Sequence, residues 1–434
     1  MNDKSHIPPA IRLLAEQDLS YFSSPRDLFK QYNRIAKEVA SQAEWTCENF
    51  DYFDHKSKQP GSLIITASGG LNPFSEHDIC SQPACRTHAA LQIARTLGLY
   101  ADVVLIPDVL SYSLADMRKP THAQMEWILT QMLVVKVLYP LIEAGVIRFW
   151  SGSMAVCRNC QKLLKKQIKE GTAILADELH KYIHVEIKGD LICIRTTGMM
   201  EGPTIFIREL KQEEKRKLKS GVSLNTLAKK IYCKIIEERI NNTLCDLRFS
   251  EAASSMLFST SRSELYALRS YDKDAPAISN LAVWEKTRSI QLPWVNEMTP
   301  QQVVDLRDAA SKALPGFRET FVRQIASPSA SIESVANKID ELRNDAIEVE
   351  REIAALNPLS EDNFRNLAGA LGITVSVYGF AAGFTPPAVA LGGLITLLGL
   401  VHTSSRHDEL EKAKLVSQPA YVLVKAKELI EHAP

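Results

Sequence analysis

Four cysteines stand in two pairs whose spacing could bind a metal ion. Cys80 and Cys85 are five residues apart, and Cys157 and Cys160 form a C-x-x-C. Each pair follows a short apolar segment that we expect to be a β-strand. Loops that follow parallel strands emerge at the same edge of a sheet, so a strand order with the first and third strands as neighbours would bring the four thiols together. Four thiolates in a reducing compartment suit a tetrahedral structural zinc.

Other interpretations of these cysteines stay open. The C-x4-C spacing is wider than a usual zinc knuckle, and 71 residues separate the two pairs. Unlinked buried thiols are one alternative, because cysteine packs as a small hydrophobic residue. A redox pair at Cys157 and Cys160 is another, since a helix N-terminus stabilises a thiolate. His77 and His88 are nearby alternative metal ligands.

The loop after the second expected strand carries polar side chains that could contact a ligand. Ligands of open α/β sheets bind at the carboxyl edge of the strands, and the candidate ligand-binding residues there are Asp108, Tyr112, Arg118, Lys119 and His122. A weaker set of catalytic candidates is Asp108, Asp116 and Glu126, whose carboxylates could hold Mg²⁺ for hydrolysis of nucleotides or nucleic acid. Gly69-Gly70 also follows a strand, but no helix is expected directly behind it, so neither a dinucleotide fingerprint nor a P-loop is present.

The elements that would position these residues alternate between strand and helix. Short apolar runs predict buried strands at 62–67, 101–107 and 145–150, separated by helices at 86–100 and 123–143. Strands that alternate with helices favour a parallel sheet. A hairpin follows over 182–197, with its turn at 188–190. The sequence therefore predicts an α/β domain at 61–210, after an N-terminal helical arm at 1–60.

Beyond this domain the pattern becomes helical, with a domain at 211–330 and a C-terminal region at 331–434. Thr299, Pro300 and Gln302 have the types expected at the start of a helix. Apolar residues then repeat with strict heptad spacing at Ile332, Val335, Ile339, Leu342, Ala346, Val349, Ile353 and Leu356. This repeat favours a long helix packed against a partner helix, either within the chain or in a homo-oligomer through Ile332 to Leu356.

The segment after the heptad helix contains no Asp, Glu, Lys or Arg from Asn366 through Ser405. Pro386 and Pro387 divide it into apolar halves, Leu367 to Phe384 and Ala388 to Val401. As helices these would span roughly 27 Å and roughly 21 Å, against about 30 Å of membrane hydrocarbon. Two predictions stay open: a hairpin that engages a membrane through Leu367 to Val401, or a glycine-rich helical hairpin in a soluble core.

Composition bounds the remaining choices. The chain has 51 Lys and Arg against 51 Asp and Glu, so it has no overall attraction to nucleic acid or acidic lipid, and any such contact needs a local patch. Nucleic acid is accordingly not an expected partner. The N-terminal residues contain no apolar run resembling a signal peptide, which favours the cytoplasm, with the apolar hairpin peripheral to or inserted in the inner membrane.

Together these features predict a non-enzymatic intracellular sensor or effector, of a kind that would suit stress or phage defence. A zinc-stabilised α/β domain would bind something at its carboxyl edge, and the C-terminal hairpin would engage a membrane or oligomerise. Two alternatives remain: a metal-dependent hydrolase acting from the loop after the second strand, and a soluble scaffold whose hairpin is core.

Overall fold

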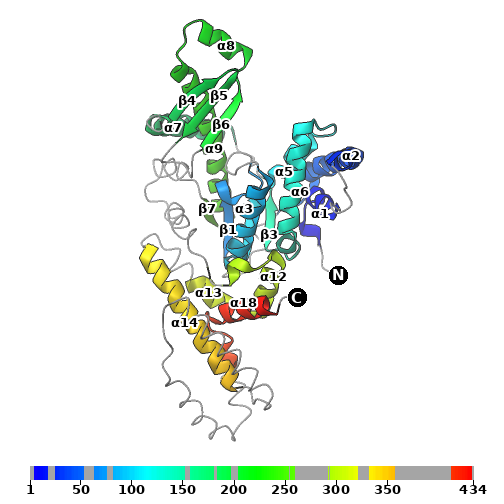
Figure 1. Cartoon of the computed structure of the whole chain (residues 1–434), viewed down its shortest axis with the longest axis vertical. Helices are drawn as coiled ribbons and strands as arrows, with labels where there is room; N and C mark the ends of the chain where they lie inside the picture. The colour runs from blue at the N-terminus through cyan, green and yellow to red at the C-terminus, as the bar shows by residue number, and fades with distance from the viewer. Residues whose placement is uncertain are drawn as a thin grey trace.

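The architecture is an α/β domain joined to a mostly helical remainder, as the sequence predicts (Figure 1). The computed structural model describes residues 4–17, 25–52, 63–75, 82–151, 157–179, 183–196, 204–253, 255–259, 292, 294–320, 332–356 and 412–432. The uncharged stretch from Asn366 to Ser405 lies outside these residues, so its two alternatives stay predictions.

A parallel sheet of four strands forms the centre of the molecule. Its strands are β1 (Ile64–Ser68), β2 (Val103–Pro107), β3 (Ile147–Trp150) and β7 (Met256–Ser259), in the order β3-β2-β1-β7. The first three confirm the strands expected from apolar runs. The fourth was not expected, because it lies within 211–330, where the sequence pattern predicts helices.

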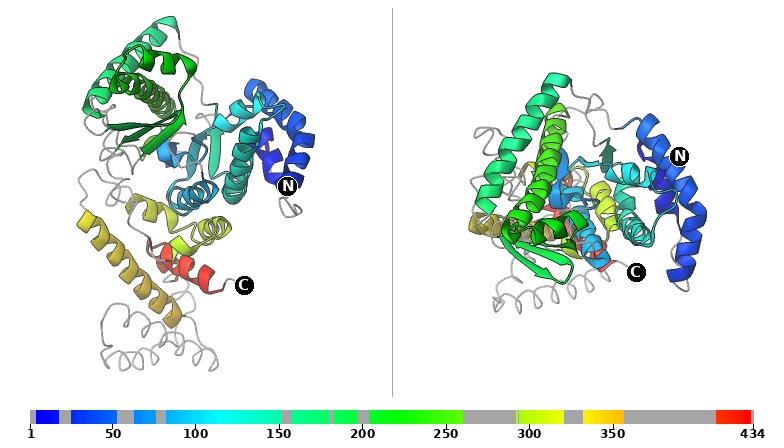
Figure 2. Two further views of the ribbon diagram at one scale, coloured as in Figure 1. Left: turned by 45° about the horizontal axis from the view of Figure 1, so that its top comes forward. Right: turned by 90° about the horizontal axis from the view of Figure 1, so that it is seen from above.

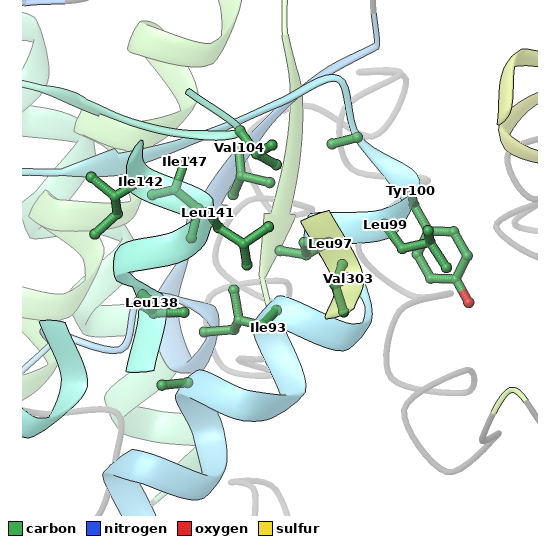
Figure 3. Packing of buried hydrophobic residues seen from close by; sticks show 14 of the residues in the cluster. Ile93, Leu97, Leu99, Tyr100, Val104, Leu138, Leu141, Ile142, Ile147 and Val303 are labelled. Carbon is green, nitrogen blue, oxygen red and sulfur yellow. The ribbon is translucent and has the colours of Figure 1, made fainter. Parts of the chain in front are cut away.

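Two layers of helices cover one face of the sheet. The inner layer contains α3 (Pro83–Arg95), α4 (Leu97–Tyr100) and α6 (His122–Glu143), whose apolar side chains pack on Val104 and Ile147 (Figure 3). Outside it lie η1 (Lys4–His6), α1 (Pro9–Glu16), α2 (Pro25–Asn49) and α5 (Val109–Ala115). By length and composition, α6 is the one helix among the described residues that could cross a membrane, and 56% of its apolar window is buried here inside the protein.

The chain between β3 and β7 builds a second, smaller unit, which we call the antiparallel unit (residues 157–252). It contains α7 (Arg158–Leu179), β4 (Ile183–Lys188), β5 (Leu191–Thr196), β6 (Thr204–Glu209), α8 (Gln212–Lys219) and α9 (Leu224–Ala252). The expected hairpin is confirmed as β4 and β5, paired with the turn at Gly189 and Asp190, and β6 extends it to three antiparallel strands.

The helix α9 runs from the antiparallel unit to the parallel sheet. Near its start, Leu227 and Ile231 pack on the small sheet, and further along, Ile236 and Ile240 pack on α7. At its end, Phe249 stacks on Trp150 with ring centroids 4.0 Å apart, on the face of the parallel sheet opposite α3 and α6. One rigid element thus joins the two sheets.

The C-terminal helices are fastened to the amino edge of the parallel sheet. They are η5 (Val295–Glu297), α12 (Pro300–Ala309), α13 (Leu314–Thr320), α14 (Ile332–Leu356) and α18 (Tyr421–Glu431). Arg307 of α12 donates 2.6 Å hydrogen bonds to the carbonyls of Gly98 and Ala101, and Arg318 of α13 pairs with the Asp102 carboxylate just before β2. Thr299 and Gln302 form the expected capping box of α12.

The predicted heptad helix is confirmed as α14. Its residues Ile339, Leu342, Ala346 and Val349 are buried, and α18 from the same chain packs against it. In Figure 1 and in the left panel of Figure 2, α14 lies toward one end of the elongated molecule and the antiparallel unit at the other, with the parallel sheet between them.

Candidate functional site

The carboxyl edge of the parallel sheet contains a reversal of strand order. From β1 the chain moves outward to β2 and then β3, and it returns to the other side of β1 as β7. In open α/β sheets such a reversal opens a crevice outside the carboxyl ends of the two strands that flank it, and ligands bind there. Here those ends are Ser68 of β1 and Ser259 of β7, which are partners in the ladder.

The backbone turns sharply where β1 ends. Gly69 follows Ser68 with φ +58°, in the left-handed region where a side chain is strained. A short 3-10 turn, η3 (Gly69–Leu71), then closes with a hydrogen bond from the Asn72 amide to the Gly69 carbonyl. Glycine at this point lets the main chain leave the strand without a side chain above the sheet edge.

Ser68 is joined to a carboxylate from the antiparallel unit. Its hydroxyl donates a 2.5 Å hydrogen bond to Oδ2 of Asp246 on α9, a residue 178 positions away in the sequence. Ser68 is 1% exposed and Asp246 is 8% exposed. A hydrogen bond to a carboxylate is shorter and stronger than one between neutral groups. It also orients the serine oxygen, so that its lone pairs point away from Asp246.

A second set of hydroxyl contacts holds the end of α9 on the sheet. The hydroxyls of Thr66 and Ser255 lie 2.7 Å apart, and the hydroxyl of Ser250 donates to the carbonyl of Ser255 at 2.8 Å. Thr66 and Ser68 are on the same face of β1, because side chains alternate along a strand. The polar residues of α9 therefore face the polar residues of β1 up to the carboxyl edge.

Asp108, the first of the predicted ligand-binding and catalytic residues, is a buried helix cap. The prediction of a loop directly after β2 was wrong, because the helix α5 begins at Val109. One carboxylate oxygen of Asp108 accepts from the Ser111 amide at 2.9 Å, and the other accepts from the hydroxyl of Tyr52 at 3.0 Å. Asp108 is 1% exposed, and burial raises the pKa of its carboxyl above its ordinary value. Both oxygens therefore accept hydrogen bonds from the protein itself.

The other predicted residues of this segment are exposed and spread from α5 to α6. Arg118 pairs with Glu44 of α2 at 2.5 Å, and His122 Nδ1 lies 3.5 Å from Glu126 Oε1. The exposed candidates are Tyr112, Asp116, Arg118, Lys119, His122 and Glu126. Asp116 and Asp108 both lie near Cys47, where burial is the main cause that raises the pKa of the thiol to about 11.

The strand order changes the argument for the zinc site. Because β2 lies between β1 and β3, the two cysteine pairs do not follow neighbouring strands. Cys85 is exposed in the first turn of α3, and Cys157 is exposed just before α7. Cys80 and the side chain of Cys160 lie outside the described residues. Among the side chains that are described, no three His, Cys, Asp or Glu gather as a metal site would require, and the four-cysteine zinc site stays a prediction.

Sequence reasoning missed the two residues that meet at the strand reversal. Ser68-Gly69-Gly70 is visible as a polar and glycine-rich end to an apolar strand. Asp246 carries no local signal, since it lies in the middle of an ordinary helical pattern. No protein-family model, curated protein or solved structure matches this chain.

Proposed function

We propose that the protein is a non-enzymatic sensor whose α/β domain binds a nucleotide-type small molecule at the carboxyl ends of β1 and β7. The observation that carries the proposal is the strand order β3-β2-β1-β7 with all strands parallel. It matches the strand order 3-2-1-4 at the centre of doubly wound nucleotide-binding sheets, in which the ligand binds at the reversal between the first and fourth strands.

Buried polar groups at this edge support a binding role. The Ser68 oxygen, which its hydrogen bond to the Asp246 carboxylate orients, is an acceptor for a hydroxyl or amino group of a ligand. The indole Nε1 of Trp150 is buried and has no hydrogen-bond partner in the described part of the chain. Trp150 lies on the same face as Ser68, two strands and about 10 Å away. A buried donor without an acceptor is destabilising, which a bound ligand would correct.

The second half of the proposal is the response. In the C-terminal region, α14 packs on α18, which in turn packs on α12. The uncharged segment from Asn366 to Ser405 follows α14 in the sequence. We infer that ligand binding at the carboxyl edge is coupled to membrane engagement or oligomerisation by this region, at the inner face of the membrane. The zinc at Cys80, Cys85, Cys157 and Cys160 would be structural.

The experiment is a binding assay on the full chain. Isothermal titration with ATP, ADP, NAD⁺ and adenosine is expected to show binding of at least one probe, which Ser68→Ala and Asp246→Asn each weaken at least tenfold. Thr66→Val is the matched control, because it removes an equally buried hydroxyl contact on the same strand, below the edge. Binding of none of the four probes, or equal losses in all three variants, would contradict the proposal.

A further inference from the structure

The first three turns of α7 carry positive charge without any negative charge. Residues 158–169 contain five Lys and Arg and no Asp or Glu, and the five side chains are all exposed. We call them the α7 stripe: Arg158, Lys162, Lys165, Lys166 and Lys169. The nearest acidic residue along the helix is Glu170, whose Oε1 lies 3.8 Å from Lys166 Nζ.

The α7 stripe lies on one side of the helix. Successive residues of an α-helix are about 100° apart around its axis, and this places the five side chains within an arc of about 100°. The opposite side of α7 is fixed, because Leu164 and Ile168 pack against α9. The α7 stripe therefore faces solvent on a fixed helix, and it is about 16 Å long at a rise of 1.5 Å per residue.

This arrangement is unfavourable for the helix alone. Like charges three or four residues apart repel, and Arg158, Lys162 and Lys166 stand at such spacing, as do Lys165 and Lys169. Positive charges near the N-terminus of a helix also oppose its dipole, and the first turn of α7 has no acidic residue. An ordinary solvated helix face mixes the two signs, as α8 does with Glu213 and Lys217. A polyanion would remove the repulsion.

The stripe belongs to a unit with excess positive charge. Residues 157–252 contain 19 Lys and Arg against 13 Asp and Glu, although the whole chain contains 51 of each. The balance of the whole chain therefore hides a basic unit, because the rest of the chain is acidic by the same amount. A local basic patch is the feature that contact with nucleic acid requires in a neutral protein.

The position of the stripe distinguishes between two kinds of polyanion. The antiparallel unit lies at the end of the molecule opposite α14 (Figure 1, and Figure 2, left). A membrane surface that contacted the α14 end of the molecule would be distant from α7. A free nucleic acid has no such restriction, and about 16 Å of helix spans four to five phosphates of one strand at about 3.4 Å each.

The geometry points to the α7 stripe as a binding surface for the phosphate backbone of double-stranded nucleic acid, independent of base sequence. Lysine binds phosphate as a point charge and supplies no fixed pattern for reading bases. Affinity would come from release of counterions, so it falls steeply as salt concentration rises. This inference departs from the sequence expectation, and it does not depend on the small-molecule site.

The test is fluorescence anisotropy of the full chain with labelled 30-base-pair DNA and RNA duplexes, between 50 and 200 mM salt. We expect Lys162, Lys165, Lys166 and Lys169, all changed to Glu, to weaken duplex binding at least tenfold. The magnitude of the slope of log K against log salt should fall by about 3.6, since each of the four lost phosphate contacts removes roughly 0.9. A second variant with the four lysines changed to Gln keeps good helix formers and should give a smaller loss in the same direction.

The matched control changes the same amount of charge elsewhere. Lys30, Lys37, Lys312 and Lys414 are exposed and lie outside the antiparallel unit, and their joint change to Glu should leave duplex affinity within threefold. Equal losses in both quadruple variants would show a net-charge effect and overturn the inference. No duplex binding at 50 mM salt would overturn it as well. The inference would also be overturned if binding to phosphatidylserine vesicles required the α7 lysines while duplex binding did not. The α7 stripe would then be a membrane-binding surface.

Discussion

The ammonium of Lys427 lies 2.9 Å from both carboxylate oxygens of Glu350. Lys427 is on α18 and its side chain is 8% exposed, whereas Glu350 is on α14, one position after the heptad residue Val349. The position next to a heptad core residue is where ion pairs between packed helices set partner and orientation. The intramolecular alternative for a partner of α14 therefore has a specific contact in α18, while the homo-oligomer stays a prediction.

Removal of Glu350 tests this contact. Glu350→Ala leaves the Lys427 ammonium buried without its carboxylate, and we expect a loss of about 2 kcal/mol in the free energy of unfolding, measured in urea. Glu348→Ala changes an exposed residue of the same helix and should stay within about 0.5 kcal/mol. Equal effects of the two variants would mean that the ion pair does not hold α18 on α14.

Asp108→Asn tests the pH dependence of a buried cap. Because burial raises the pKa of Asp108 in the folded state, its contribution to stability is present at low pH and is lost as pH rises through the raised pKa. Asn caps a helix as well as Asp and has no charge to lose. The variant should therefore gain stability relative to the natural chain as pH rises above the ordinary pKa of a carboxyl, in unfolding measured across a pH series. Asp116→Asn, at an exposed position, should leave the pH dependence of the free energy of unfolding as it is in the natural chain. The same result for Asp108→Asn would refute the prediction. The same variant tests the alternative of a hydrolase, which requires the ionised Asp108.

Gln131→Leu is expected to stabilise the fold. Gln131 on α6 is fully buried, and neither atom of its side-chain amide has a hydrogen-bond partner among the described residues. An unsatisfied buried amide costs about 1–3 kcal/mol, which an apolar side chain of similar size avoids. Thermal unfolding should show a higher Tm for Gln131→Leu and almost no change for Gln161→Leu, which is exposed on α7. A lower Tm for Gln131→Leu would indicate that the amide binds an internal group.

Metal analysis tests the predicted zinc. Protein purified without added metal should contain about one zinc per chain if the four cysteines form a single structural site. Cys85→Ser and Cys157→Ser should each lower the zinc content and the Tm, while Cys47→Ser should leave the zinc content unchanged. A metal-free, folded natural chain would end this prediction and favour unlinked thiols.

Fractionation tests the membrane prediction for the uncharged segment. Pro386→Asp with Pro387→Asp places two charges at the turn that would enter hydrocarbon, where charges are strongly unfavourable. The natural chain should stay in the membrane pellet after a carbonate wash, and this variant should not. Ser417→Asp with Gln418→Asp, at exposed positions outside the segment, should behave as the natural chain does. A natural chain found wholly in the soluble fraction would favour the hairpin as core.

Local patterns determined much of the fold. Apolar runs predicted β1, β2 and β3, a capping box predicted the start of α12, and heptad spacing predicted α14 over Ile332 to Leu356. These features depend on residues within one or two turns of each other, so their chemistry can be read along the chain.

Only the tertiary structure decided the order of the strands and, with it, the candidate site. The short strand β7 has no pattern of its own, yet its pairing with β1 creates the reversal at Ser68. Asp246 reaches Ser68 across 178 positions, and Asp108 is a buried cap because Tyr52 and α5 close around it. The physical reason is that burial and long-range hydrogen bonds depend on which distant segments pack together, and no residue type or spacing along the chain carries that information.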